Sequence, residues 1–175
     1  MRKKNEYDFA LIFELLENEK AEDYLDALYE AGCDDATIGM GKIGYISVDF
    51  IREAEYCYDA IESAIANVKK AIPHAKLIYV SPDLVGVKEL SLIFECTRQN
   101  IQKHASKLSF PTSVYKGNQT LWHLDNVLDW FVTNKIDVSQ ELIDVARLSK
   151  QINLNLELEN ADIKTTEQAK KLIAI

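Results

Sequence analysis

The sequence predicts an α+β fold in which a sheet-forming half precedes a mostly helical half. Three observations predict it. In the first half, apolar residues recur at a period of two in some stretches and of three or four in others, which indicates alternating strands and helices. Pro82 and Asp83 then interrupt this pattern. Beyond them, short apolar stripes separated by turn residues indicate small helices and one hairpin.

The first three predicted elements lie between residues 7 and 40. A strand is predicted in YDFALIFELL (7–16), where every second residue is apolar and would share one face: Phe9, Leu11, Phe13 and Leu15. An amphipathic helix follows and runs to Gly32, which has the conformational freedom to end it. Its apolar residues have helical spacing: Ala21, Tyr24, Leu25, Leu28 and Tyr29. The short stretch ATIGM (36–40) is predicted as a second strand.

The next three elements complete a βαββαβ order. In YISVDFI (45–51), Ile46, Val48 and Phe50 point one way, and the glycines before this strand indicate a hairpin. A helix follows as far as Pro73, with an apolar stripe of Ile61, Ala64, Ile65, Val68 and Ile72. AKLIYVS (75–81) is the fourth strand. This order is that of the ferredoxin-like domain, so residues 1–82 are predicted to form two helices over a four-stranded antiparallel sheet.

Charge is distributed unevenly along the chain, whose formal net charge is −8. Residues 1–82 hold 9 Lys and Arg against 16 Asp and Glu, whereas residues 83–134 hold 5 of each kind. The window from Thr97 to Leu124 contains four Lys or Arg residues and no Asp or Glu. A polyanion would bind at this window, whereas the acidic first domain should repel DNA.

Two short helices joined by a tight turn are predicted at the start of residues 83–134. The inner face of the first helix consists of Val87, Leu90, Ile93 and Phe94. After a turn at Glu95 and Cys96, Thr97 is a suitable N-cap for the second helix. The inner stripe of this second helix is Ile101, Ala105 and Leu108. Two helices joined in this way form a helix-turn-helix.

The outward face of the second helix carries amides and cations. At about 100° per residue, the stripe turns these side chains outward or onto the flanks: Arg98, Gln99, Asn100, Gln102, Lys103, Ser106 and Lys107. Arg can bind guanine, and Asn or Gln can bind adenine, through paired hydrogen bonds. We therefore expect two roles on double-stranded DNA. Base edges would be read by Arg98, Gln99, Asn100 and Gln102, and phosphates would be bound by Lys103, Lys107 and Lys116.

A hairpin and a third helix are predicted next. FPTSVYKGNQTLWHL alternates around Gly117 and Asn118, which indicates a small wing with Lys116 and Asn118 near its tip. LDNVLDWF then supplies a helix whose apolar side chains can close the core: Val127, Leu128, Trp130 and Phe131.

Taken together, VKELSLIFECTRQNIQKH, FP and LWHLDNVLDWF resemble the winged helix-turn-helix of the MerR/excisionase-like superfamily over residues 84–131. The matching positions are Thr97, Arg98, Phe110, Pro111, Trp122 and Trp130. Glu95 stands where that family usually has a turn glycine, and Ser91 where it has a small apolar residue. The resemblance implies a sequence-specific DNA-binding protein, expected to be a bacterial transcriptional regulator. We also expect Thr97, at the start of the second helix, and Asn118, at the hairpin tip, to lie at its interface.

Residues 135–175 are predicted to be helical. Apolar residues recur at intervals of three or four: Val138, Leu142, Val145, Leu148, Ile152 and Leu156. This stripe could lie back on the first domain or pair with a second copy. Because a lone winged helix reads only a few base pairs, we expect a homodimer formed through this helix or the first sheet. TTEQAKKLIAI (165–175) can form a last helix capped at Thr165 or Thr166.

No catalytic, metal or cofactor site is predicted, and we expect the protein not to be an enzyme. Cys33, Cys57 and Cys96 lie far apart without zinc-ligand spacing. The sequence contains neither a signal peptide nor a membrane span, so we expect a soluble cytoplasmic protein. Two alternatives stay open. One is an antitoxin or adaptor whose acidic first domain binds a protein partner, and the other is a small-molecule sensor or enzyme built on that domain.

Overall fold

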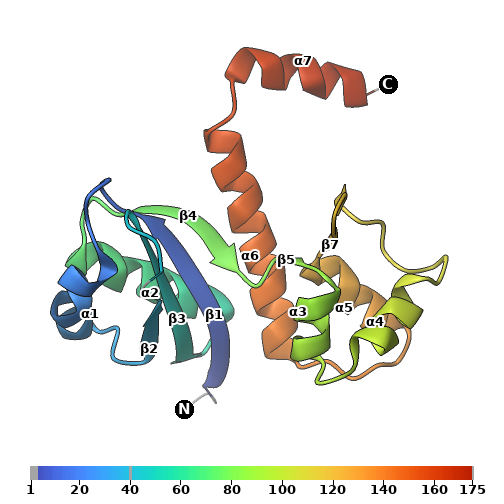
Figure 1. Ribbon diagram of the computed structural model, residues 1–175, viewed down its shortest axis with the longest axis horizontal. Coiled ribbons are helices and arrows are strands. Elements are labelled where there is room, and N and C mark those ends of the chain that lie inside the picture. Colours follow the sequence, from blue (N-terminus) through green and yellow to red (C-terminus); the bar gives the residue numbers. More distant parts are fainter. Residues whose placement is uncertain (1–3, 40, 175) are drawn as a thin grey trace.

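The computed structural model describes residues 4–39 and 41–174 (Figure 1). The described part is of the mixed α+β class, with seven α-helices and two antiparallel sheets, so the predicted fold class is confirmed. None of the described helices combines the length and the hydrophobicity that crossing a membrane requires. Met40, predicted at the end of the second strand, lies outside the described residues, as does Ile175 at the end of the last predicted helix.

The first sheet contains β1 (Asn5–Glu14), β2 (Ala36–Gly39), β3 (Tyr45–Ala54) and β4 (Lys76–Ser81) in the order β2-β3-β1-β4. All neighbouring strands in it are antiparallel. Because side chains alternate between faces, the predicted inner residues of β1 and β3 meet on one side. Phe9 lies opposite Phe50, with ring centroids 5.4 Å apart. The alternation therefore predicted the buried face correctly.

Helical segments cover this buried face: η1 (Ala21–Tyr24), α1 (Leu25–Ala31) and α2 (Cys57–Ala71). Gly32 ends α1 with a φ of 98°, a left-handed conformation that favours glycine. The predicted inner position of Tyr29 is wrong, because this side chain is 70% exposed. Residues 21–24 form a 3-10 helix, which has about three residues per turn. The α-helical spacing assumed from Ala21 onward therefore does not hold, and Tyr29 points away from the core.

Six further elements surround a second core: β5 (Leu84–Val85), α3 (Val87–Ile93), α4 (Arg98–Ala105), β6 (Tyr115–Lys116), β7 (Thr120–His123) and α5 (Leu124–Thr133). Buried members of this core include Leu90, Ile101, Phe110, Trp122, Leu128, Trp130 and Phe131. The predicted inner position of Leu108 is wrong. Helix α4 ends at Ala105, so Leu108 falls in the following turn and is fully exposed.

Helix α6 (Gln140–Glu159) packs against both cores. Val145 belongs to the core under the first sheet, whereas the next residue, Ala146, belongs to the second core. The predicted stripe is therefore divided. Val145, Leu148 and Ile152 pack against the core of the first sheet, and Val138 and Leu142 pack against the second core. Helix α7 (Ile163–Ile173) is capped by Asp162, whose Oδ1 accepts a hydrogen bond from Thr165 N at 2.7 Å. The predicted caps Thr165 and Thr166 are thus wrong, because the helix begins earlier.

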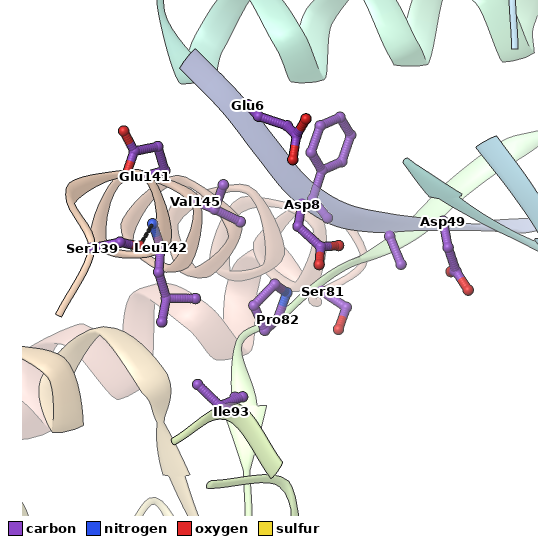
Figure 2. Close-up of a pocket in the computed structure, with 12 residues that line it drawn as sticks. Glu6, Asp8, Asp49, Ser81, Pro82, Ile93, Ser139, Glu141, Leu142 and Val145 are labelled. Carbon is purple, nitrogen blue, oxygen red and sulfur yellow. Dashed lines mark hydrogen bonds between the residues drawn. The ribbon is translucent and has the colours of Figure 1, made fainter. Parts of the chain in front are cut away.

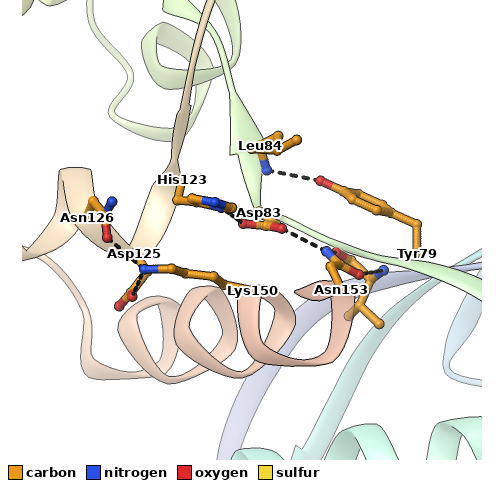
Figure 3. A network of polar contacts seen from close by, with 9 residues as sticks. Tyr79, Asp83, Leu84, His123, Asp125, Asn126, Lys150 and Asn153 are labelled. Carbon is orange, nitrogen blue, oxygen red and sulfur yellow. Dashed lines mark hydrogen bonds and ion pairs between the residues drawn. The ribbon is translucent and has the colours of Figure 1, made fainter. Parts of the chain in front are cut away.

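Buried polar contacts connect the two halves at Asp83 (Figure 3). Asp83 is 2% exposed, and its carboxylate lies 2.6 Å from His123 Nδ1. The same carboxylate accepts a hydrogen bond from Asn153 Nδ2 at 2.9 Å. Asn153 also bonds the backbone N–H and C=O of Val80, both at 2.8 Å. The junction is therefore packed and hydrogen-bonded, unlike a solvated linker.

Candidate nucleic-acid interface

Helix α4 is fixed by its N-terminus and by one buried side chain. Thr97 Oγ1 accepts a hydrogen bond from Asn100 N at 3.2 Å, which confirms the predicted N-cap. Glu95, in the turn before it, has a φ of 47° and so adopts the left-handed conformation for which glycine is usually selected. Ile101 is 1% exposed and holds the helix against the second core. The helix therefore presents a defined outer face.

This outer face carries the side chains that the sequence predicts to contact DNA. The exposed members are Thr97, Arg98, Gln99, Asn100, Gln102, Lys103 and Lys107. Within the described residues, no ion pair neutralises Arg98 or Lys103. Their charge and hydrogen-bonding capacity are thus available to a ligand in solution.

The predicted hairpin stands beside α4. Strands β6 and β7 pair antiparallel, with Lys116 opposite Thr120, and Gly117 N donates to Gln119 O at 3.1 Å in the turn. Asn118 is exposed at the tip. At the base, Trp122 is 6% exposed, and its Nε1 donates to Pro111 O at 3.0 Å. The hairpin is therefore anchored at its base and exposed at its tip.

A groove of about 710 Å³ separates α4 from this hairpin, and we call it the α4 groove. Its polar lining comes from three elements. Arg98, Gln102 and Ser106 line it from α4 and its C-cap, Lys88 and Glu89 from α3, and Lys116, Gln119 and Thr120 from the hairpin and its turn. The structure thus places three of the predicted residues, Arg98, Gln102 and Lys116, on the walls of one groove.

The remaining predicted residues lie outside the walls of the α4 groove. Gln99, Asn100 and Lys103 are exposed elsewhere on α4, and Asn118 is at the hairpin tip. Lys107 follows the helix, and its Nζ lies 5.3 Å from the centroid of the Trp130 ring. A cation over an indole face is attracted to it, so part of the Lys107 side chain is used in packing.

Two charged residues at the α4 groove were not predicted as part of the site. Lys88 and Glu89 come from α3, which the carboxylate-free window beginning at Thr97 leaves out. Glu89 Oε2 accepts a hydrogen bond from Gly86 N at 3.0 Å and so caps α3. The polar face of α3, which carries both residues, was the sequence feature that could have indicated a contribution of this helix to the site. One carboxylate therefore faces the groove in spite of the acid-free sequence of α4.

His104 lies on the inner side of α4. Its ring contacts Trp130 and Phe131 edge-on, with centroid distances of 5.5 and 5.6 Å. Nδ1 is buried and has no hydrogen-bond partner among the described residues. Burial, and then the charges of Lys107 and Lys103, lower the pKa of this imidazole. His104 therefore packs against the core as a neutral ring and does not extend toward the solvent face.

A second cavity, of about 640 Å³, lies between the first sheet and the start of α6 (Figure 2). Glu6, Asp8 and Asp49 contribute carboxylates from the sheet, and Glu141 contributes one from α6. Burial, followed by repulsion from Asp49, raises the pKa of Asp8. Four acidic side chains would repel phosphate, so this cavity is not part of a nucleic-acid interface.

Neither metal ligands nor similar proteins add to this description. Over residues 4–39 and 41–174, no three His, Cys, Asp or Glu side chains are grouped in a way that could hold a metal ion. No family model, curated protein or solved structure matches the chain.

Proposed function

We propose that the chain is a sequence-specific double-stranded DNA-binding protein, acting as a transcriptional regulator of bacterial type. The observation that supports this most directly is the exposed row of amides and cations on α4 beside an anchored hairpin. These are the groups that hydrogen-bond base edges and phosphates. The function requires no covalent step, cofactor or metal.

The order of elements supports a two-domain interpretation. Strand order β2-β3-β1-β4 with α1 and α2 on one face is the arrangement expected of a ferredoxin-like domain over residues 1–82. Two short helices, a hairpin and a third helix around the second core are the parts expected of a winged helix-turn-helix over residues 83–134. Residues 135–175 form the helical extension.

In this proposal α4 enters the major groove, which is wide enough for one helix. Arg98, Gln99, Asn100 and Gln102 read base edges, with Thr97 and Asn118 at the margins of the interface. Lys103, Lys107 and Lys116 bind phosphates, and Lys88 joins them from α3. Figure 1 shows α4 and the hairpin on the side of α6 away from the first sheet. The acidic first domain can therefore remain clear of bound DNA.

Selection of bound duplexes from a random pool tests the proposal. Binding should be retained at moderate salt for one enriched motif and should weaken steeply as salt increases. Equal retention of all sequences would contradict base reading by α4. Absence of duplex binding, with single-stranded DNA or RNA bound instead, would contradict the function itself.

A second candidate function is binding of a small cationic ligand or a basic protein partner by the acidic first domain. The observation that favours it is the cavity of Figure 2, which combines carboxylates with apolar walls of Ile93, Leu142 and Val145. A ligand that binds only the folded protein raises its melting temperature. Thermal unfolding with a panel of amines and basic peptides tests this candidate, and no shift with any member would argue against it.

A further inference from the structure

Helix α7 presents apolar side chains for which the described chain has no binding partner. None of its described residues is buried, and the exposed ones include Ile163 at 78%, Leu172 at 73% and Ile173 at 85%. Figure 1 shows α7 projecting from the end of α6, away from both sheets. An isolated helix of 11 residues is marginally stable in water, so its apolar stripe needs a partner surface.

The corner between α6 and α7 holds α7 in this projecting position. Ala161 N donates to Leu158 O at 3.2 Å, and Asn160 Nδ2 donates to Leu156 O at 2.9 Å. Lys76 Nζ donates to Asn160 Oδ1 at 3.2 Å, which connects the corner to β4. These contacts fix the end of α6, from which α7 projects. A surface on a second molecule can therefore reach α7 without any change at this corner.

A suitable acceptor lies between α2 and α6, and we call it the α2–α6 groove. It has a volume of about 260 Å³ and is lined by Tyr58, Ile61, Glu62, Ile65, Leu148 and Ile152. A cavity of roughly 150 Å³ lined by aliphatic side chains accepts benzene, so this groove has room for the ends of two aliphatic side chains. Glu62 is the one charged residue in its lining.

We propose that α7 of one copy docks into the α2–α6 groove of a second copy, with the reciprocal contact forming a twofold dimer. Ala169, Leu172 and Ile173 share one stripe at i, i+3 and i+4, and they would enter the groove. Lys170 borders that stripe and meets Glu62. Charge favours the pairing, because α7 holds three lysines against one glutamate whereas residues 1–82 are acidic.

This inference does not depend on DNA binding, because it rests on α7 and the groove alone. If the DNA-binding proposal also holds, the exchange places two copies of α4 in one assembly, as recognition of two half-sites requires. Failure of one proposal would leave the other testable. The dimer is measured without DNA, and motif selection does not require a particular dimer interface.

Sedimentation equilibrium across a concentration series tests the proposal on the full chain. Wild type should approach twice the 19.9 kDa mass of one chain. Leu172→Asp combined with Ile173→Asp should return the mass to that of one chain, because two carboxylates cannot enter an apolar groove. Lys171→Asp is the matched control, since it makes the same change of two charge units on the opposite face of α7 and should leave the dimer intact. Circular dichroism checks that each variant is folded.

A charge exchange identifies the groove as the acceptor. Glu62→Lys and Lys170→Glu should each weaken the dimer several-fold, and the double variant should recover most of the loss because the pair is restored with reversed signs. Monomeric wild type at all concentrations would overturn the proposal. A dimer that survives the double aspartate variant, or that shows no recovery in the exchange, would also overturn it.

Discussion

The side-chain amide of Asn153 in α6 bonds both backbone groups of Val80 in β4, with N–H to Oδ1 and Nδ2 to C=O distances of 2.8 Å each. β4 is an edge strand of the first sheet, and an exposed edge can pair with another chain. Asn153 therefore takes the place of a neighbouring strand at this residue. Through Asp83, the same amide also connects the first sheet to the second core.

We predict that Asn153→Ala lowers the free energy of unfolding by about 1–3 kcal/mol, because it leaves buried groups of Val80 and Asp83 without a partner. Urea unfolding measures the loss. Asn155→Ala is the control, since Asn155 is exposed on the same helix and bonds only Gln151 O. Its cost should stay below about 0.5 kcal/mol. Equal costs for the two variants would show that the bonds to Val80 contribute little.

Two cations at the α4 groove should respond differently to substitution. Arg98→Ala should weaken binding to the selected motif by roughly 1–3 kcal/mol and relax base choice at one position. Lys116→Ala should weaken binding to all duplexes alike and reduce the salt slope by about one unit. Fluorescence anisotropy on matched and scrambled duplexes distinguishes them. Lys70→Ala, on the exposed surface of α2, is the control and should change neither the affinity for DNA nor the base preference. Uniform loss for both groove variants would contradict base reading by Arg98.

The sequence predicted those features that depend on residues close together in the chain. Alternation identified the buried face of β1 and β3, and the short apolar stripe with Thr97 identified α4. Leu108 was misplaced because helical spacing was extended past Ala105, where the Ser106 cap ends the helix. Local periodicity does not contain the information about where such a stripe stops.

Features that depend on distant residues could not be predicted in this way. Asp83 and Asn153 are 70 positions apart, and each by itself resembles an ordinary solvated polar residue. Their burial follows from α6 returning between the two cores. Likewise, Glu89 reaches the α4 groove only because α3 packs beside α4. The sequence of α4 contains no acidic residue, and only the packing of α3 against α4 brings the Glu89 carboxylate to this surface.

The half-buried ring of His104 should make stability depend on pH. Its pKa is lowered from the ordinary value of 6.5, so the unfolded chain takes up a proton at higher pH than the folded chain does. This contribution to stability is complete above about pH 6.5 and is lost as the pH falls from there through the folded pKa. His104→Phe keeps an aromatic ring against Trp130 but cannot titrate. Urea unfolding at about pH 7.5 and about pH 5.5 measures this effect. Between these two pH values the free energy of unfolding should fall less in the variant than in wild type. Equal losses in the variant and wild type would contradict a lowered pKa of His104 in the folded protein.

The carboxylate of Glu89 should oppose DNA binding at the α4 groove. Glu89→Gln removes this charge, while its amide oxygen can still accept the hydrogen bond from Gly86 N. Exposed charge interactions are worth about 0.2–1 kcal/mol, so affinity for every duplex should rise by that amount at low salt and by less at high salt. Glu30→Gln makes the same charge change on α1, remote from α4, and serves as the control. Anisotropy titrations at two salt concentrations measure both variants. If Glu89→Gln binds no better than Glu30→Gln, phosphates do not approach the wall of the groove that α3 forms, and the duplex would have to contact α4 from the side of Gln99 and Lys103 instead.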